Sequence, residues 1–431
     1  MDKQINRFDR FLWVFLLINP FLDVITGVYI NLREHVTGVA FKTLAVPVTP
    51  SLVVRTAMLL VFAAYLLSRR SRTGLLTLAG VAAAWALSVA SEYFVFGSLA
   101  LFSDMQYIAR FAFNLAALLA YGVSLRGRED ANALLERAAR VTLLVFSLTI
   151  LLSVLFGVGY STYTDRFGFR GSRGFFYAGN DVSAAMLLLL PLAFSSWLEL
   201  PREASAGRKL LYVLTPAFTC AALCLLGTKT AFLAVAVSAA FFLIYTLAAP
   251  GRRTRFPRTV LVLAAAAAVL ALLSLGSATS VPELIAKSFT MTGNIAQQEN
   301  VGTALLSGRP ARVLEALRLW RSGGVFAWLF GTGRGLHGAI LEMDVFELLV
   351  YYGVVGGTAL AWYWLRELWR FVLAFFRRLR GSLPAASCLL ALVLGCAYLF
   401  LAGHVLFSVT SGFYLAMLLL YGEALARQDA A

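Results

Sequence analysis

Charged residues are scarce in this sequence. They make up 14% of its 431 residues, whereas apolar residues make up 60% and the mean hydropathy is +0.79. A soluble domain of this length exposes far more charge, so that class of protein is excluded. The three histidines, His35, His337 and His404, are scattered and make poor material for a metal site, so no metal is expected. All four cysteines lie in apolar runs, which argues against disulfides and zinc sites.

Apolar runs long enough to cross about 30 Å of hydrocarbon recur from one end of the chain to the other. They predict an all-α polytopic membrane protein with about 12 transmembrane helices, forming one integral membrane domain over residues 1–431. The predicted spans are residues 11–30, 52–67, 74–95, 104–124, 138–158, 181–199, 209–226, 229–248, 259–276, 343–365, 384–402 and 404–423. The first run has a charged start but no small-residue cleavage site, so it is interpreted as a span and not as a signal peptide.

The basic residues indicate how the chain crosses the membrane. With the N-terminus in the cytoplasm, every inside segment is basic, and these segments hold most of the 37 lysines and arginines. This fit predicts a protein of the cytoplasmic (inner) membrane with both termini in the cytoplasm. Most of the net charge of +15 is therefore an orientation signal, and no nucleic acid partner is expected.

A smaller set of basic residues breaks this rule, because it lies in the predicted outside loops. The members with the strongest case for a function are Arg170, Arg173, Lys229, Arg309 and Arg312. Cations on the translocated side oppose insertion, and an anion bound at the outer face would explain them. Ordinary solvated loop charge is the alternative, although several of these residues lie on short, glycine-rich turns.

The largest outside loop, residues 277–342, lies between the ninth and tenth predicted spans. Within it the segment Ser307–Trp320 predicts an amphipathic helix near the membrane surface, with Pro310 in its first turn. Arg309 lies at the N-terminus of this helix, where free N–H groups also favour an anion. The following segment LFGTGRGLHG (329–338) is either a phosphate-binding loop built from backbone N–H groups or a simple turn.

Three acids open the tenth span: Glu342, Asp344 and Glu347. Carboxylates are electrostatically favoured at a helix N-terminus, and that is one interpretation. The other is a general base that faces an arginine-lined site. The spacing of three places Asp344 and Glu347 on one helix face and leaves Glu342 elsewhere or in the preceding loop.

Ionisable residues also lie deeper in the predicted spans. Because charges inside a membrane are costly and usually paired, we expect Arg55 or Arg110 to pair with an acid. The acids available for this pairing are Asp23, Glu92 and Asp104.

Four segments, taken in order, resemble motifs of the superfamily that contains O-antigen ligases and O-antigen or capsule polymerases. RGFFYAGNDVSAAMLLLLP (173–191) resembles the Gly–aromatic–Asn segment that leads into a span. GTKTAFLAVAVSA (227–239) resembles the Ser-Arg-Gly-Ala turn, with Lys229 where arginine is usual. SGRPARVLEALRLW followed by LFGTGRG (307–335) is similar to the Ser-Gly-Arg helix and Gly-x-Gly loop, and MDVFELLVYYGVVGG (343–357) to the Asp-aromatic-Leu helix with Gly-x-x-Gly.

The resemblance implies a glycosyltransferase with a GT-C-like membrane architecture that needs no cofactor or metal. Its donor would be a polyprenyl-pyrophosphate-linked glycan, moved en bloc to a hydroxyl of a glycan or lipid-glycan acceptor at the external face, among membrane lipids. The ligases carry a histidine, proposed as catalytic, at the position that counting back from Gly353 assigns to Glu342. This difference slightly favours a polymerase; an O-antigen ligase acting on lipid A-core and a lipid-linked glycan flippase are the alternatives.

Within that resemblance the charged residues of the outer face take distinct roles. The expected pyrophosphate ligands are Arg309 and Arg173 first, then Arg170, Lys229 and Arg312. Glu342 is expected to accept the proton of the acceptor hydroxyl, with Asp344 and His337 as competitors for that role.

Overall fold

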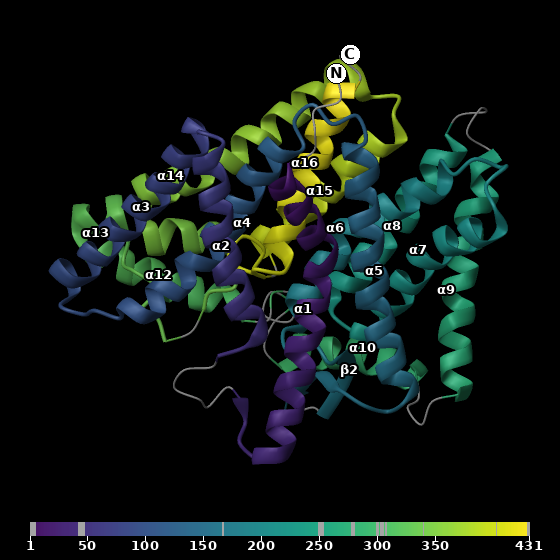
Figure 1. The fold of residues 1–431 in the computed structure, drawn as a ribbon. Coiled ribbons are helices and arrows are strands. Elements are labelled where there is room, and N and C mark those ends of the chain that lie inside the picture. Colours follow the sequence, from purple (N-terminus) through teal and green to yellow (C-terminus); the bar gives the residue numbers. More distant parts are fainter. Residues whose placement is uncertain are drawn as a thin grey trace. The chain divides into compact units, whose positions relative to one another are not determined.

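The structure, a computed structural model, is built almost entirely from helices (Figure 1). It describes residues 6–41, 48–165, 168–248, 254–276, 281–298, 301, 306, 308–338, 340–401 and 403–428. Long apolar runs must satisfy their backbone groups internally in lipid, and a helix does so within a single segment. Side chains cap several helix starts: Ser71, Ser205 and Thr228 each accept a hydrogen bond from a backbone N–H of the first turn.

Eleven helices of the described residues are long and apolar enough to span a membrane. They are α1 (Arg7–Thr37), α2 (Pro50–Ser68), α3 (Arg72–Phe96), α4 (Leu101–Ser124), α5 (Ala131–Leu155), α6 (Gly179–Leu198), α7 (Ala206–Leu226), α8 (Lys229–Leu247), α9 (Phe256–Gly276), α14 (Asp344–Ala374, continued by the π-helical turn η3, Phe375–Leu379) and α15 (Leu383–Leu401). Each overlaps one predicted span. The prediction of an all-α polytopic membrane protein is confirmed.

The last predicted span, residues 404–423, differs in the structure and is not among these eleven. A helix, α16, extends only over Ser411–Gln428, and residues 403–410 form a loop ahead of it. Its first twelve residues are all buried by protein, while charged and polar residues at its C-terminal end lower its hydropathy. A short apolar run can form a core helix as well as a span, and hydropathy alone does not separate the two.

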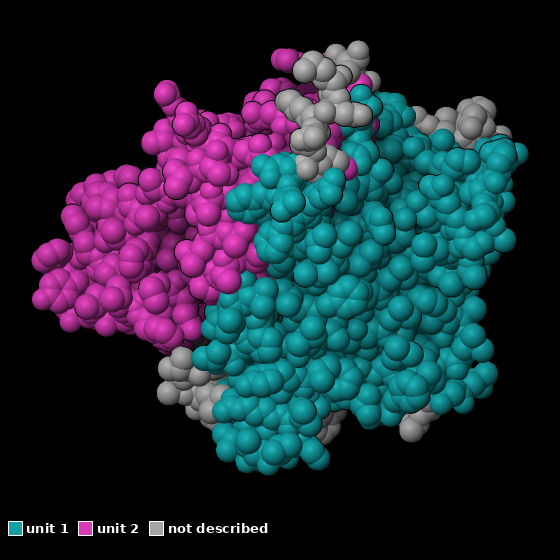
Figure 2. Space-filling view, viewed as in Figure 1, with its two compact units in different colours: residues 1–54, 129–294, 379–394 teal, residues 55–128, 295–378, 395–431 magenta. Residues whose placement is uncertain are grey.

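The chain forms two compact units, which Figure 2 colours separately. Unit 1 consists of residues 1–54, 129–294 and 379–394, and unit 2 of residues 55–128, 295–378 and 395–431. Both units are assembled from segments that are far apart in the sequence. Segments that are distant along the chain therefore meet within each unit.

In unit 1, α5, α6 and α7 pack against one another, and α1, α8 and α9 pack around them. Phe194 of α6 stacks on Phe242 of α8, with ring centroids 4.8 Å apart. A two-stranded antiparallel hairpin, β1 (Tyr160–Asp165) and β2 (Gly168–Gly174), contacts α5 and α7. This hairpin occupies much of the outside loop predicted at 159–180, and it carries Arg173.

In unit 2, α14 packs against α3 and α16, and α4 contacts the same two helices. The region predicted as a large loop holds α10 (Val281–Gln298), most of which belongs to unit 1, and α12 (Arg309–Ser322) and α13 (Gly324–Phe330) of unit 2. The helix predicted over 307–320 is confirmed as α12: Val313 and Ala316 are buried, while Glu315 and Arg318 are exposed. α12 and α13 both contact α14.

α14 is broken at Gly353, whose φ of 69° and ψ of −176° are accessible essentially to glycine alone. Gly331, at the end of α13, has nearly the same conformation, with φ of 87° and ψ of −175°. A Cβ on Gly331 would lie 2.1 Å from the carbonyl oxygen of Tyr351, and one on Gly353 would lie 2.4 Å from the carbonyl carbon of Leu329. Two backbones therefore touch at this point, and only glycine fits on either side.

The carbonyl groups that the break releases from α14 find donors in neighbouring segments. The N–H of Thr332 donates to the carbonyl of Val350 at 2.9 Å, and the N–H of Gly333 donates to that of Tyr351 at 3.1 Å. The hydroxyl of Ser88 in α3 donates a further hydrogen bond to Tyr351 at 2.6 Å. Irregular backbone at membrane depth is tolerated when protein groups satisfy it in this way.

Candidate functional site

Glu342 lies in the loop immediately before α14, which agrees with the prediction from its spacing. Its Oε2 accepts hydrogen bonds from Nε and Nη2 of Arg309 at 3.0 and 2.9 Å, and Nη2 of Arg312 lies 3.8 Å away. The Glu342 side chain is 33% exposed, whereas that of Arg309 is 8% exposed. The candidate base and two candidate pyrophosphate ligands thus form one group, the arginine–glutamate cluster (Arg309, Arg312 and Glu342).

The local sequence explains why both arginines reach Glu342. Arg309 is the first residue of α12, and Pro310 follows it at a position where a missing N–H costs nothing. Arg312 lies three residues further on and so on the same side of the helix. Its Nη1 donates to the carbonyl of Ile340 at 2.9 Å, which ties α12 to the segment before α14.

Glu342 has an unusual backbone conformation, with a φ of 58° at a non-glycine residue. Its N–H donates to Oε1 of Glu347 at 2.9 Å, and its side chain is held by Arg309. These contacts maintain a conformation that costs of the order of 1–3 kcal/mol, and such residues cluster at active sites and ligand clamps. The strain adds to the case for a function at Glu342.

Asp344 and Glu347 point together into unit 2, which confirms their predicted common face. Both are fully buried. Nδ1 of His404 lies 3.5 Å from Oδ1 of Asp344 and 3.3 Å from Oε2 of Glu347. Oδ2 of Asp344 also accepts hydrogen bonds from the N–H groups of Val405 and Leu406 at 2.6 and 2.8 Å. The two acids therefore anchor the loop that carries His404.

His404 is the positive centre of this buried set of side chains. Burial alone would lower the pKa of His404, but the carboxylates of Glu347 and Asp344 outweigh it and hold that pKa well above its usual range. Tyr107 of α4 donates a hydrogen bond to Oε2 of Glu347, and its ring stacks on Phe407 with centroids 4.5 Å apart. We refer to Tyr107, Asp344, Glu347 and His404 as the buried acid–histidine group.

Three members of this group, Asp344, Glu347 and His404, place their ligand atoms within 4.8 Å of one another and could hold a metal ion. One imidazole nitrogen and two carboxylate oxygens form a donor set that zinc and related divalent ions accept. The scattered histidines gave no sign of this group in the sequence. Tyr107 and three backbone N–H groups donate to the two carboxylates. Oδ1 of Asp344 and Nε2 of His404 are buried without a hydrogen-bond partner among the described residues.

His337, another candidate for the base, lies between α13 and α14. Its Nε2 lies 2.9 Å from Oγ1 of Thr332, and its ring centroid lies 4.9 Å from that of Tyr351. Burial, together with the neighbouring Arg334, lowers the pKa of His337 to about 4. His337 is therefore uncharged at neutral pH and is a weak base.

This shift predicts a pH dependence of stability. The unfolded chain takes up a proton at His337 near the usual pKa of about 6.5, whereas the folded protein resists protonation down to about 4. The contribution of His337 to the free energy of unfolding is therefore fully present above pH 6.5 and is lost as the pH falls towards 4. We expect the melting temperature of H337Q in detergent to fall less steeply than that of the wild type over this range. If the melting temperatures of H337Q and of the wild type change with pH in the same way, the lowered pKa of His337 would be contradicted.

The glycine-rich segment 331–338 is a structural connection and not a phosphate-binding loop. The N–H groups of Thr332 and Gly333 donate to α14, and those of Arg334 and Gly335 donate to Oδ1 of Asp104 at 2.5 and 3.3 Å. Backbone donors that are already used within the protein are not available to a phosphate. Of the two interpretations of this segment, the turn is the correct one.

Glu92 and Asp104 do not take the partners expected for them. Glu92 accepts a hydrogen bond from the N–H of Ala100 at 3.3 Å, and Asp104 accepts those of the glycine-rich segment. Neither acid pairs with Arg55 or Arg110 in the part of the chain that the structure describes, so Asp23 is the remaining acid of that prediction. Backbone donors of nearby loops reach one oxygen of each acid, while Oε2 of Glu92 and Oδ2 of Asp104 are buried without a hydrogen-bond partner among the described residues.

The remaining predicted ligands belong to unit 1. The guanidinium carbon of Arg173, in β2, lies 5.1 Å from the ring centroid of Tyr160, whose hydroxyl donates to Oε2 of Glu34 at 2.8 Å. Lys229 is the first residue of α8. The side chain of Arg170 lies outside the described part of the structure. The predicted pyrophosphate ligands are thus divided between the two units, and within unit 2 Arg309 and Arg312 lie together at Glu342.

Comparison with known proteins bears on the class of this site. Residues 5–301 match the family described as O-antigen ligase like membrane protein. The chain belongs to this family. A search among curated proteins found no match to the chain. The family match ends ahead of the arginine–glutamate cluster, so the cluster rests on the geometry given above.

As an O-antigen ligase-like protein, the chain is a multi-pass membrane protein and an enzyme of the glycosyltransferase type. The family acts in glycan transfer during surface polysaccharide assembly, with lipid-linked glycans and membrane lipids as its general partners. This agrees with the expectation from the motif order.

The sequence did not identify His404 and Tyr107 as members of a site, and it placed Glu347 only by its spacing. His404 follows an apolar run and precedes another, at a short interruption. An ionisable residue at such an interruption often belongs to a functional or paired group. This was the sequence feature from which a role for His404 could have been predicted. Tyr107 had none, because buried tyrosines are common in apolar helices.

Proposed function

We propose that this O-antigen ligase-like protein transfers a glycan from a polyprenyl-pyrophosphate carrier to an acceptor hydroxyl at the external face of the cytoplasmic membrane. The arginine–glutamate cluster before α14 carries this proposal. Arg309 and Arg312 both point to one carboxylate oxygen of Glu342. In the same arrangement the two arginines would bind a phosphate oxygen. Family membership supplies the class of reaction.

In the proposed step the two arginines exchange one anion for another. The pyrophosphate of the donor replaces the Glu342 carboxylate at Arg309 and Arg312, and the released carboxylate accepts the proton of the acceptor hydroxyl. The hydroxyl oxygen forms a bond to the anomeric carbon of the donor sugar. The bond from that carbon to the phosphate oxygen breaks, and polyprenyl pyrophosphate leaves with the electron pair. A single displacement of this kind inverts the anomeric centre.

Accessibility favours Glu342 over its competitors as the base. Asp344 is 0% exposed and accepts two backbone N–H groups, so it serves to position the loop of His404. His337 is bound to Thr332, and its low pKa makes it a poor proton acceptor. Oε1 of Glu347 accepts a hydrogen bond from the N–H of Glu342. The buried acid–histidine group therefore helps to position the proposed base.

Arg173, together with Arg170 and Lys229, remains a proposed ligand of the pyrophosphate. Arg173 is half-buried, and its Nε is buried without a hydrogen-bond partner among the described residues. A buried guanidinium nitrogen of this kind costs free energy unless something accepts its hydrogen bond. An oxygen of the donor would do so.

The test is a reconstitution of the purified protein in liposomes with a polyprenyl-pyrophosphate oligosaccharide as the only glycan. A ladder of lengths with released polyprenyl pyrophosphate is expected of a polymerase, which is slightly favoured because Glu342 stands where the ligases carry histidine. A single transfer that appears only after a lipid A-core acceptor is added would identify a ligase. Movement of intact donor across the bilayer, without transfer, would contradict the proposal and support a flippase.

Glutamine at Glu342 tests the base. The amide still accepts hydrogen bonds from Arg309 but takes up no proton, so we expect the transfer rate at saturating donor to fall about a hundredfold or more. E315Q removes an exposed acid of α12 and serves as the matched control, with a rate near that of the wild type. An unchanged rate in E342Q would assign the base to another residue.

A further inference from the structure

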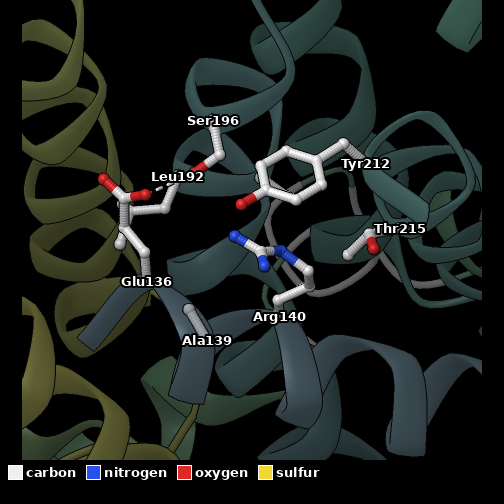
Figure 3. Close-up of a pocket in the computed structure, with 8 residues that line it drawn as sticks. Glu136, Ala139, Arg140, Leu192, Ser196, Tyr212 and Thr215 are labelled. Carbon is white, nitrogen blue, oxygen red and sulfur yellow. Dashed lines mark hydrogen bonds between the residues drawn. The ribbon is translucent and has the colours of Figure 1, made fainter. Parts of the chain in front are cut away.

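A polar hollow lies in unit 1 among α5, α6 and α7 (Figure 3). Its outer part has a volume of about 170 Å³, and its narrow inner part a volume of about 10 Å³. Glu136, Ser196 and Tyr212 line both parts. The inner part holds about one water molecule, whereas the outer part has room for a small polar group. None of the residues proposed for glycan transfer lines it.

Two guanidinium groups flank one tyrosine in this hollow. The guanidinium carbon of Arg140 lies 3.7 Å from the ring centroid of Tyr212, and Figure 3 shows the group against the ring. That of Arg208 lies 5.4 Å from the same centroid, and its Nη2 donates to the Tyr212 hydroxyl at 3.5 Å. Glu136 attracts the charge of Arg140, and Tyr212 forms a hydrogen bond with Arg140. Arg140 is half-buried, and its guanidinium carries five N–H donors, more than a single tyrosine hydroxyl can accept.

The acids near the hollow already have partners. Oε2 of Glu136 accepts a hydrogen bond from the hydroxyl of Ser196 at 3.3 Å, and Oε1 of Glu199 lies 3.5 Å from Nη2 of Arg255. Ser195, which also lines the outer part, is 2% exposed, and its hydroxyl has no hydrogen-bond partner within the described structure. The hydroxyl of Ser195 and the remaining N–H groups of the two guanidinium groups therefore leave donors in the hollow, which suits an anion with several oxygens.

The position of the hollow along the membrane-spanning helices indicates which kind of anion it would bind. It lies near the first residues of α5 and α7 and the last residues of α6, the ends that the distribution of basic residues assigns to the cytoplasm. Arg140 lies about 14 Å along α5 from its start at 1.5 Å per residue, within reach of the headgroup level for a long side chain. The basic segment 202–209 beside it adds positive potential.

We propose that this hollow binds a phosphate group, with the headgroup phosphate of an anionic phospholipid as its source. Arg140 and Arg208 would donate to the phosphate oxygens from the two sides of Tyr212. The hydroxyl of Ser195 would donate from the wall of the outer part. The site is separate from the glycan-transfer residues, and its ligand is a lipid that is bound and not consumed.

The test uses the full chain, purified in dodecyl maltoside and depleted of lipid, with the melting temperature as the measurement. The probes are dioleoylphosphatidylglycerol, dioleoylglycerol as the same lipid without its phosphate, and glycerol 3-phosphate in water. Phosphatidylglycerol is expected to raise the melting temperature by binding the folded state, and dioleoylglycerol is not. In R140Q the phospholipid concentration that gives half of the shift is expected to rise about tenfold or more.

R202Q is the matched control, because it removes one exposed cation from the neighbouring basic segment without altering the hollow, and it should respond as the wild type does. R140K keeps the charge and covers the case in which R140Q does not fold; it should retain part of the response. A shift caused by glycerol 3-phosphate alone would support the phosphate site and reassign its source to a soluble compound. Equal responses of the wild type and R140Q, or no response at all, would overturn the proposal.

Discussion

Alanine at Arg309 is expected to lower the rate of glycan transfer by about a hundredfold or more. Negative charge builds on the pyrophosphate as the sugar–oxygen bond breaks, and a fixed donor aimed at that charge stabilises the transition state. Arg309 is the best-placed donor in the cluster, because it is nearly buried and two of its nitrogens reach one oxygen at 2.9 and 3.0 Å. The measurement is the initial rate of polyprenyl pyrophosphate release in liposomes.

Two further variants separate chemistry from folding. R309K keeps the charge but loses the planar pair of donors, so we expect a rate between those of alanine and arginine. R318A removes an exposed arginine of the same helix and should leave the rate near that of the wild type. Melting temperatures of all three show whether the fold survives. A folded R309A protein with a rate within threefold of the wild type would remove Arg309 from the donor site.

Several features were predictable because their causes are local. An apolar run longer than the hydrocarbon core has one stable solution, a helix, and eleven such helices are found in the described residues. α12 follows from Pro310 and the helical spacing of Val313 and Ala316. The common face of Asp344 and Glu347 follows from helix geometry alone. Each of these predictions depends on residues within a few turns of one another.

The contact partners of Asp344 and Glu347 could not be predicted from nearby residues in the sequence. The hydrogen bond from Tyr107 to Glu347 joins residues that are 240 positions apart, and the loop of His404 reaches Asp344 over 61 positions. Scattered positions in the sequence therefore said nothing about whether a histidine meets two acids in space. The phosphate-loop interpretation of 331–338 failed for a similar reason, since distant partners accept its N–H groups: carbonyls at the break in α14 accept those of Thr332 and Gly333, and Asp104 accepts those of Arg334 and Gly335.

That break gives the second large expected effect: alanine at Gly353 should destabilise unit 2 by about 3 kcal/mol or more. Its φ of 69° and ψ of −176° disfavour any side chain, and a Cβ would lie 2.4 Å from the backbone of Leu329. The clash is with main-chain atoms, which cannot turn aside as a flexible side chain can. The measurement is the melting temperature in detergent, together with the yield of monodisperse protein.

Gly80→Ala is the matched control, because Gly80 lies in α3 with nothing within 4 Å of a Cβ, and alanine there should be neutral or stabilising. Ser88→Ala removes only the hydrogen bond to Tyr351 and should cost about 1 kcal/mol, which gives a measurable value if G353A yields no folded protein. A melting temperature of G353A equal to that of G80A would show that α14 is continuous at this point. Since the break at Gly353 allows the backbones of residues 329–331 and 351–353 to touch, a continuous helix would also remove the structural reason for the first glycine of the Gly-x-x-Gly motif.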